Sequence, residues 1–280
     1  MKIRAIKTAV LRPPKDDLLR AIAEAIPTRQ GLGPRAHPRS QSGSRSELLC
    51  EKSIVVVTSK VVSIWQGRCV PASAAGTDPA RARREKDALT MREADLYLPR
   101  AATPGAWCMH TIKNNIFIPS AGVDESNADG YYILWPRDVA GAARTLWTWL
   151  RRRYGVRELG VIITDSHTIP LRRGVLGISL AHYGFSPLRD YRGEGDLFGR
   201  ALKMTQKNIP DALAAAAVVL MGEGAERTPL ALITDVPWVE FTSRPARSAK
   251  PFSSFEIRTR EDLYYPLLSA MKWKKGRGGK

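Results

Sequence analysis

Five short clusters of polar residues follow apolar runs in this sequence, and their chemistry suits a metal and phosphate site. They are Thr58-Ser59-Lys60, Asp124-Glu125-Ser126-Asn127, Asp165-Ser166, Asp190 to Arg200, and Gly222-Glu223-Gly224. Mg²⁺ takes few protein oxygens and fills its remaining positions with water and phosphate. Carboxylates beside hydroxyls and glycines are therefore what a divalent cation with a phosphate ligand requires.

Each cluster also has a purely structural interpretation when it is taken alone. Asp124 can close an Asx turn, and Glu223 can be a solvated loop residue. Asp190 and Arg192 can form a surface ion pair. Arg192 and Arg200 can instead act as bidentate forks that neutralise a phosphate or a carboxylate. The residues by themselves leave both interpretations open.

Several well-known catalytic motifs are missing from the chain. There is no GxxxxGK[ST] loop, no HExxH pair and no GxSxG elbow. The glycine-rich run RGEGDLFGR (192–200) is one residue too long for GxGxxG. Asp165-Ser166-His167 does not make a catalytic triad by adjacency, because successive strand residues point in different directions. A P-loop site is excluded, and a serine hydrolase is disfavoured.

The elements that must position these clusters are predicted from local patterns. Short β-branched or apolar runs predict strands over 2–11, 53–58, 108–118, 159–164 and 230–234. Capping residues, helical spacing and stops at Pro27 and Gly222 predict helices over 16–25, 80–94, 138–154, 210–221 and 260–271. Because strands and helices mix without strict βαβ alternation, we expect an α+β (mixed α/β) fold rather than a Rossmann or P-loop sheet.

Positive charge is concentrated in two segments. The chain has 280 residues, 44% of them hydrophobic, and a formal net charge of +17. An Arg/Gly/Pro/Ser-rich stretch over 28–47 is predicted to be a flexible basic insertion in a domain that spans 1–242. Residues 243–280 are predicted to be a basic C-terminal extension ending in a solvated tail. Without an aromatic-rich RNA-binding motif or zinc-finger spacing, a nucleic-acid function is disfavoured.

The positions of the cysteines and the lengths of the apolar runs argue against several further classes of protein. Cys50, Cys69 and Cys108 lie far apart, which argues against a disulfide scaffold or zinc ribbon and favours a reducing compartment. The longest apolar run, 212–221, is about half of the roughly 20 residues that a membrane helix requires. Residues 1–7 lack the features of a secretory signal. We therefore expect a cytoplasmic protein with no membrane partner.

Six longer segments, taken together and in their order along the chain, form a more specific pattern than any single motif. They are KDDL (15–18), VVVTSKVVSIWQGR (55–68), AGVDESN (121–127), VIITDS (161–166), LRDYRGEGDLFGR (188–200) and DALAAAAVVLMGE (211–223). In wording and order they resemble the coenzyme F420-0:γ-glutamyl ligase family, from residue 15 to about residue 234. The resemblance implies the fold of that family.

The resemblance further implies a reaction. Members join the α-amino group of L-glutamate to a carboxylate acceptor, as GTP- or ATP-dependent acid–amino-acid ligases of the peptide-synthase type. The implied route transfers the γ-phosphoryl group to the acceptor, and the amine then displaces phosphate from the acyl phosphate. Mg²⁺ or Mn²⁺, in a two-metal site, is the implied cofactor.

Roles for individual residues follow from the same resemblance. Asp124 and Asp165 resemble catalytic ligands of one metal ion, and Ser166 with Glu223 those of a second. The residues implied to contact the nucleotide are Leu11, Pro13, Thr58, Ser59, Lys60, Asn127, Gly222 and Gly224. Residues 221–228 resemble a loop that closes over the nucleotide. Arg192 and Arg200 are our own candidates for contacts to the acceptor or to phosphate.

Departures from the family pattern concern the acceptor. Ile64 stands where F420-branch members usually carry a second lysine, and the segment after Ser166 keeps only Pro170 and Arg172 of the usual motif. TDSHTIPLRRGV, TIKNN and YYILWPRD look closer to a bacterial branch described as folate-metabolism γ-glutamate ligases. The acceptor is therefore F420-0 or a folate, both of them anionic conjugates of an aromatic heterocycle. His167 is either an acceptor contact or a structural histidine.

Two further expectations concern partners and the competing class of function. Family members are homodimers, so the resemblance implies a dimer. The alternative to an enzyme is a non-catalytic nucleotide- or RNA-binding protein on a degenerate ligase fold. The joint presence of Asp124, Asp165 and Glu223 favours the enzyme, because a degenerate member has no chemical reason to keep all three.

Overall fold

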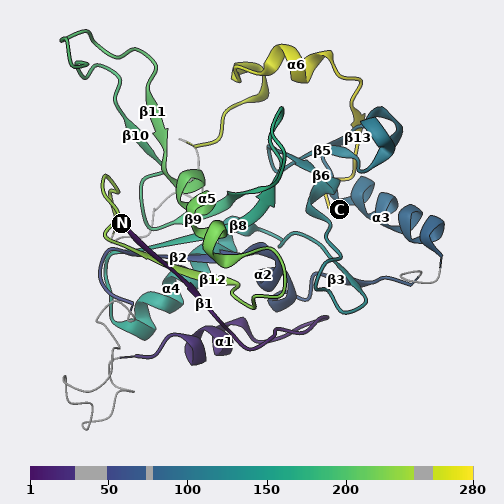
Figure 1. Ribbon diagram of the computed structural model, residues 1–280, viewed down its shortest axis with the longest axis horizontal. Helices are drawn as coiled ribbons and strands as arrows, with labels where there is room; N and C mark the ends of the chain where they lie inside the picture. The colour runs from purple at the N-terminus through teal and green to yellow at the C-terminus, as the bar shows by residue number, and fades with distance from the viewer. Residues whose placement is uncertain (29–48, 74–77, 243–254, 280) are drawn as a thin grey trace.

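The structure is a computed structural model that describes residues 1–28, 49–73, 78–242 and 255–279, and a five-stranded sheet lies at its centre (Figure 1). In spatial order its strands are β1 (Lys2–Ile6), β12 (Leu230–Thr234), β2 (Ser53–Thr58), β8 (Leu159–His167) and β9 (Leu176–Tyr183). β2 and β8 pair in parallel, and the other pairs of this sheet are antiparallel. The mainly antiparallel sheet confirms the predicted α+β class.

Helices cover both faces of the sheet, because its central strands are apolar on both sides. Val55 and Val57 of β2 belong to the core on one face, and Ile54 and Val56 belong to the core on the other. The helices of the first face are α1 (Leu18–Ala25), α2 (Ser59–Trp65) and α4 (Val139–Tyr154), and α5 (Ile209–Met221) covers the second (Figure 1). Side chains alternate between faces along a strand, so one continuous apolar run supplies both cores.

A second group of strands packs around helix α3 (Pro79–Glu93). Its four-stranded sheet contains, in spatial order, β13 (Lys274–Lys275), β4 (Leu96–Tyr97), β5 (His110–Lys113) and β6 (Ile116–Pro119). Nearby, β3 (Cys69–Pro71) pairs with β7 (Tyr131–Ile133). Short 3₁₀ turns occur at Arg100–Ala102, Pro104–Ala106, Ser120–Gly122 and Thr259–Glu261.

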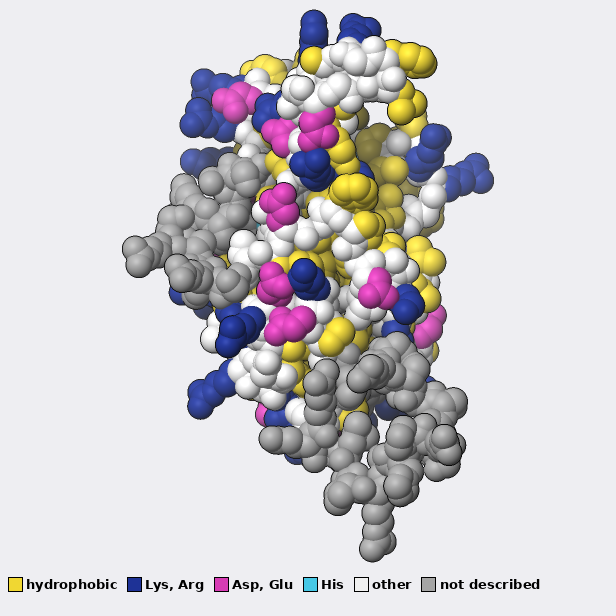
Figure 2. Space-filling model, turned by 90° about the vertical axis from the view of Figure 1, so that its left-hand side faces the viewer, with side chains coloured by type: hydrophobic (Ala, Val, Ile, Leu, Met, Phe, Trp, Pro, Cys, Tyr) yellow, Lys and Arg dark blue, Asp and Glu magenta, His cyan; other side chains and the backbone are white. Residues whose placement is uncertain are grey.

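An arm projects from the body between β9 and α5 (Figure 1). It consists of β10 (Leu188–Asp190), β11 (Gln206–Asn208) and the long loop between them. Leu197 is 98% exposed and Phe198 is 94% exposed in that loop. Figure 2, which views the molecule from the side of the arm, shows basic and hydrophobic side chains together at its upper end. The arm therefore carries apolar surface with no partner within the described chain.

Most predicted elements are confirmed, and three differ in extent for local reasons. The strand predicted over 2–11 ends at Ile6, because its partner β12 offers only five residues for pairing. The strand predicted over 108–118 is a hairpin, with Asn114 and Asn115 at positive φ in a two-residue turn. The helix predicted over 260–271 is only α6 (Tyr265–Ala270), because Pro266 is tolerated in a first turn but not in a helix interior.

Most residues of the C-terminal tail are exposed, as predicted, but its backbone is docked on the body. β13 pairs with β4, and the N–H groups of Gly278 and Gly279 donate to the carbonyls of Ala94 and Arg92 at 2.9 Å. These bonds satisfy orphan carbonyls at the C-terminal end of α3. The predicted insertion lies outside the described residues from residue 29 onward. None of the helices in the described ranges combines the length and hydropathy that crossing a bilayer demands.

Candidate active site

The candidate site forms where β2 and β8 end next to each other. In their parallel register Thr58 lies opposite Thr164, so the residues that follow them reach the same edge of the sheet. After Thr58 the chain turns into α2, which begins with Ser59 and carries Lys60. After Thr164, β8 continues through the partly buried residues Asp165 and Ser166. The sheet topology thus brings together two clusters that are 107 residues apart.

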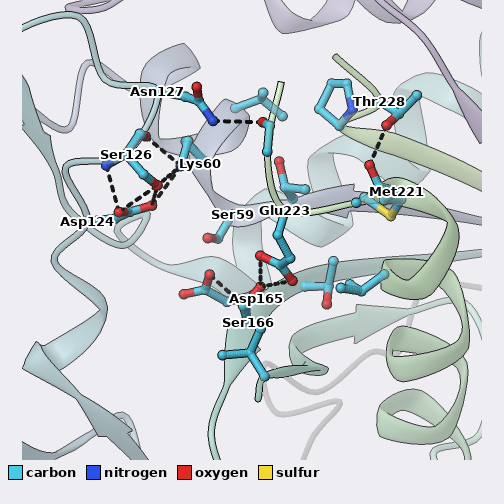
Figure 3. A pocket seen from close by; sticks show the side chains of 18 of the residues that line it. Ser59, Lys60, Asp124, Ser126, Asn127, Asp165, Ser166, Met221, Glu223 and Thr228 are labelled. Carbon is cyan, nitrogen blue, oxygen red and sulfur yellow. Dashed lines mark hydrogen bonds and ion pairs between the residues drawn. The ribbon is translucent and has the colours of Figure 1, made fainter. Parts of the chain in front are cut away.

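Asp124 is anchored at this edge by its backbone and neutralised by a lysine. Its N–H donates to Ile133 O at 3.0 Å, and its carbonyl accepts from Ile133 N at 2.8 Å. Asp124 Oδ2 lies 2.7 Å from Lys60 Nζ, while Oδ1 accepts from Ser126 N at 2.9 Å and Ser126 Oγ at 3.0 Å (Figure 3). Burial opposes ionisation, but Lys60 and these hydrogen bonds outweigh it and hold the pKa of Asp124 below its ordinary value.

Asp165 lies in the same cavity in a different environment. Burial raises the pKa of its carboxyl to about 6, although hydrogen bonds from the Trp135 indole and from Ser166 N oppose the rise. Asp124 lines the same cavity, and its charge adds to the rise. Neighbouring carboxylates of this kind favour a cation between them.

Glu223 comes from the end of α5 and meets Ser166. The Ser166 hydroxyl contacts both carboxylate oxygens of Glu223, at 2.7 and 2.8 Å (Figure 3). Gly222 ends α5 with φ +77, a left-handed backbone conformation that glycine adopts and that other residues adopt only with strain. The glycine turn therefore directs Glu223 back toward β8.

The loop over 222–228 is fastened to the opposite wall of the site. Asn127 Nδ2 donates to Gly224 O at 2.9 Å, and the Thr228 hydroxyl donates to Met221 O (Figure 3). Glu226 accepts from Gly224 N at 2.8 Å, which gives the loop an internal brace. The loop thus lines one side of the cavity, and its closure over a nucleotide stays a prediction.

One cavity of about 760 Å³ is lined by eleven of the fourteen predicted site residues. These are Leu11, Thr58, Ser59, Lys60, Asn127, Gly222 and Gly224 from the nucleotide set, and Asp124, Asp165, Ser166 and Glu223 from the metal set. A space of this size is in the range of small-molecule and cofactor sites.

Three predicted residues do not line this cavity. Pro13 lies next to the lining segment Thr8 to Leu11 but is not part of it. Arg192 and Arg200 lie on the arm, where the Arg192 guanidinium binds both carboxylate oxygens of Asp190. Within one chain, neither arginine contacts the cavity. His167 also lies outside the lining, and burial lowers its pKa.

The carboxylates suit a cation that binds together with a nucleotide better than a metal ion whose ligands are all protein side chains. Among the residues that the structure describes, no three acidic, histidine or cysteine side chains converge as a ready-made metal site. Mg²⁺ that arrives with a nucleotide needs only one or two protein carboxylates, and phosphates and water complete its shell. Asp124 and Asp165, with the Ser166 hydroxyl and Glu223 nearby, supply such hard oxygen donors.

Comparison with known proteins identifies the family of this chain. The family described as F420-0:Gamma-glutamyl ligase matches residues 6–235, which is most of the chain. This chain belongs to that family. The match contains every residue that lines the cavity, and it ends before the C-terminal segment that docks on α3.

Relatives of the family are similar over part of their length. The coenzyme F420:L-glutamate ligase of Methanothermobacter thermautotrophicus is 42% identical over 120 residues, which are 42% of this chain and 47% of that protein. The enzyme of the same name from Methanopyrus kandleri is 44% identical over 119 residues, again 42% of this chain and 47% of the relative. The chain spans about half the length of the curated relatives that it matches.

Some features of the site were missed by the family motifs. Trp135, whose indole binds Asp165, belongs to the segment YYILWPRD, but no role at the site was predicted for it. The ion pair between Lys60 and Asp124 joins two predicted residues whose contact was not foreseen. Neither contact has a local sequence pattern, because each depends on how separate strands meet.

Proposed function

We propose that this protein is a nucleotide- and metal-dependent γ-glutamyl ligase. The observation that carries the proposal is that Asp124, Asp165 and Glu223, from three separate family motifs, all line one cavity beside Lys60. A lone carboxylate at a sheet edge has many structural explanations. Three around one cavity, in a chain of this ligase family, are best explained by cation and phosphate chemistry.

The proposed reaction has two steps. An acceptor carboxylate oxygen attacks the γ-phosphorus of GTP or ATP, the bond to the β-phosphate oxygen breaks, and a nucleoside diphosphate leaves. The α-amino group of L-glutamate then attacks the acyl carbon, the carbon–oxygen bond to phosphate breaks, and the amine loses a proton as the amide forms. Phosphate is released, so each amide bond consumes one nucleoside triphosphate.

The chain's residues would act by positioning and by charge. Asp124 and Asp165 would hold Mg²⁺ or Mn²⁺, which when bound neutralises charge on the transferring phosphoryl group. Ser166 and Glu223 would support a second ion. Lys60 now neutralises Asp124, and a phosphate in the cavity would compete for its ammonium group. The loop held by Asn127 would limit access of water to the acyl phosphate.

The acceptor belongs to the class of anionic carboxylates attached to an aromatic heterocycle. The names of the relatives favour F420-0, whereas the sequence between Asp165 and Arg172 favours a folate. We also propose a homodimer, because the exposed apolar residues on the arm require cover that the described part of one chain does not give.

The test is to incubate the protein with L-glutamate, GTP or ATP, Mg²⁺ or Mn²⁺, and each acceptor in turn. Mass spectrometry should detect an acceptor that has gained one glutamyl unit, together with stoichiometric nucleoside diphosphate. Reactions without nucleotide, and reactions with Asp124→Asn, are the controls. Nucleotide binding without an adduct on any deazaflavin or pterin acceptor would favour the non-catalytic binding protein instead.

A further inference from the structure

Trp135 lies between the candidate site and a buried group of charged side chains. Its side chain is only 2% exposed, and its indole N–H donates to Asp165 Oδ2. Trp135 stands in the segment YYILWPRD, whose resemblance to a bacterial branch implies no role for this residue. A buried tryptophan usually donates its N–H to some acceptor, but here the acceptor is a carboxylate proposed to bind a cation.

The two hydrogen bonds to Asp165 fix its carboxylate plane. Oδ2 accepts from Trp135, and Oδ1 accepts from Ser166 N at 2.9 Å. A carboxylate offers about four lone-pair sites, so each oxygen keeps one for another partner. With both oxygens held, the remaining lone pairs have a set direction instead of the freedom of a rotating side chain.

Gly122 provides the space in which the indole sits. A Cβ at position 122 would lie 2.0 Å from Trp135 Nε1 and 2.4 Å from the neighbouring ring carbon. Gly122 also has φ +70, in the left-handed region that glycine tolerates. The indole therefore fills the place of a missing side chain, two residues before Asp124.

The buried charged group holds Trp135 from the other side. Arg68 Nε donates to the carbonyl of Trp135 at 3.1 Å, and Lys113 Nζ lies 5.7 Å from the centre of the indole ring. Both cations bind Glu93 Oε2, at 2.6 Å from Arg68 and 2.8 Å from Lys113. The Glu93 side chain is 1% exposed, so this group has little freedom to move. The cluster thus restrains both the backbone and the ring of Trp135.

We propose that Trp135 is a positioning residue of this site, whose indole N–H orients the Asp165 carboxylate to receive a divalent cation. The Arg68–Glu93–Lys113 cluster and Gly122 keep the indole in place. The inference rests on the proposed function only in identifying the cation. The hydrogen bond itself is testable without any metal or substrate.

The first experiment observes the hydrogen bond by NMR. In ¹⁵N-labelled protein the indole N–H resonance of Trp135 is assigned by its loss in Trp135→Phe. We expect Asp165→Asn to move this one indole resonance while the other indole resonances stay in place. The same resonance unmoved by Asp165→Asn overturns the inference.

The second experiment measures Mn²⁺ binding by electron paramagnetic resonance, with and without GTP. Outer-shell partners of metal ligands typically contribute 10- to 100-fold to metal affinity, so we expect Trp135→Phe to raise the Kd for Mn²⁺ by about that factor. Trp147→Phe is the matched control. Trp147 is 1% exposed, donates its indole N–H to Leu159 O at 2.7 Å and lies under the Arg151 guanidinium, but it does not line the cavity.

The outcomes separate the inference from the proposed function. Equal Mn²⁺ affinity in Trp135→Phe and wild type overturns the inference and leaves the ligase proposal standing. An equal loss of affinity in Trp135→Phe and Trp147→Phe also overturns it, because the effect is then one of general packing. Wild-type protein that binds no Mn²⁺ under either condition overturns the proposed metal dependence, and the inference with it.

Discussion

Two groups of charged side chains lie on either side of Trp135, and they differ in how fully their charges are offset. In the buried cluster, Glu93 is bound by both Arg68 and Lys113, and all three side chains are no more than 11% exposed. In the candidate site, Lys60 is paired with Asp124, whereas Asp165 accepts hydrogen bonds from Trp135 and Ser166 N, and Glu223 accepts from the Ser166 hydroxyl.

This difference indicates that the charges of the buried cluster stabilise the fold, whereas the carboxylates of the candidate site are available to bind a ligand. A buried ion pair needs complete partners, because an unpaired charge there is strongly unfavourable. A site that is to bind a cation instead keeps its carboxylates under-neutralised. Burial raises the pKa of Asp165, and the charge of Asp124 adds to the rise. Substitutions in the candidate site should therefore lower activity, and substitutions in the buried cluster should lower the free energy of unfolding.

The largest effect is expected for activity in the site. Asp165→Asn should lower glutamyl transfer by at least about three orders of magnitude, roughly 4 kcal/mol of transition-state stabilisation. The unfolding temperature of the metal-free protein should stay equal or rise at pH 7, because Asn removes a charge that burial disfavours. Asp235→Asn, at an exposed ion pair with Lys2, is the control and should change neither quantity. Normal turnover in Asp165→Asn would contradict its assigned role.

A substitution in the buried cluster should instead lower the stability of the fold. Glu93→Gln leaves Lys113 and Arg68 without their counter-charge, so the free energy of unfolding should fall by about 3–5 kcal/mol. Denaturant titration measures the loss. A change below about 1 kcal/mol would show that the cluster is hydrated and is not a structural ion pair.

A pH series should show two buried groups acting in opposite directions. Asp165 has a folded pKa of about 6, above its ordinary 3.8, so the folded state binds its proton more tightly and stability rises as pH falls from 6 toward 4. Burial lowers the pKa of His182 to about 4, below its ordinary 6.5, so its contribution is lost as pH falls over the same window. Each effect is up to about 3 kcal/mol.

Single variants resolve the two opposing contributions. Unfolding of the metal-free protein is followed between pH 7 and 4 in chelator. Asp165→Asn should lose stability more steeply than wild type as pH falls, and His182→Phe should lose it less steeply. Parallel curves for wild type and Asp165→Asn would mean that the pKa of Asp165 is not raised.

The ion pair in the site should contribute little to stability. Lys60 and Asp124 side chains are 26% and 44% exposed, and pairs in contact with water contribute about 0–1 kcal/mol. Lys60→Met should therefore change the free energy of unfolding by less than about 1 kcal/mol while raising the KM for the nucleotide. If Lys60→Met lowered the free energy of unfolding as much as Glu93→Gln, the candidate site and the buried cluster would not differ in their contribution to stability.

The sequence is informative about the site because two of the family motifs lie at strand ends that the sheet brings together. Thr58 and Asp165 were predicted as neighbours of strand ends, and the parallel register of β2 and β8 explains why they meet. The buried cluster was not predicted, because Glu93 of α3, Lys113 of β5 and Arg68, which precedes β3, come from three separate parts of the chain. A local sign of it existed: Thr111 and Lys113 occupy the buried positions of β5, and a lysine there requires a partner.

Deleting the C-terminal tail should have the smallest effect on activity. Because the tail is docked on α3, the experiment must distinguish the loss of its charge from the loss of its hydrogen bonds. Lys275 and Arg277 line a second cavity of about 610 Å³ beside α3, whereas the site cavity is lined by Lys86 of the same helix. Deleting residues 272–280 removes positive charge and also the hydrogen bonds of Gly278 and Gly279 to the end of α3. We expect the KM for the anionic acceptor to rise by less than about threefold, with no change for the nucleotide.

The triple variant Lys272→Gln, Lys274→Gln and Lys275→Gln distinguishes these two contributions, since it removes charge and keeps the backbone bonds. Steering by charge weakens as the Debye length falls from about 10 Å at 0.1 M salt to about 3 Å at 1 M. If charge attracts the acceptor, the triple variant should match the deletion at low salt, and both should match wild type at high salt. If the tail acts by holding α3, the triple variant should behave as wild type, and the deletion should keep its higher KM at both salt concentrations.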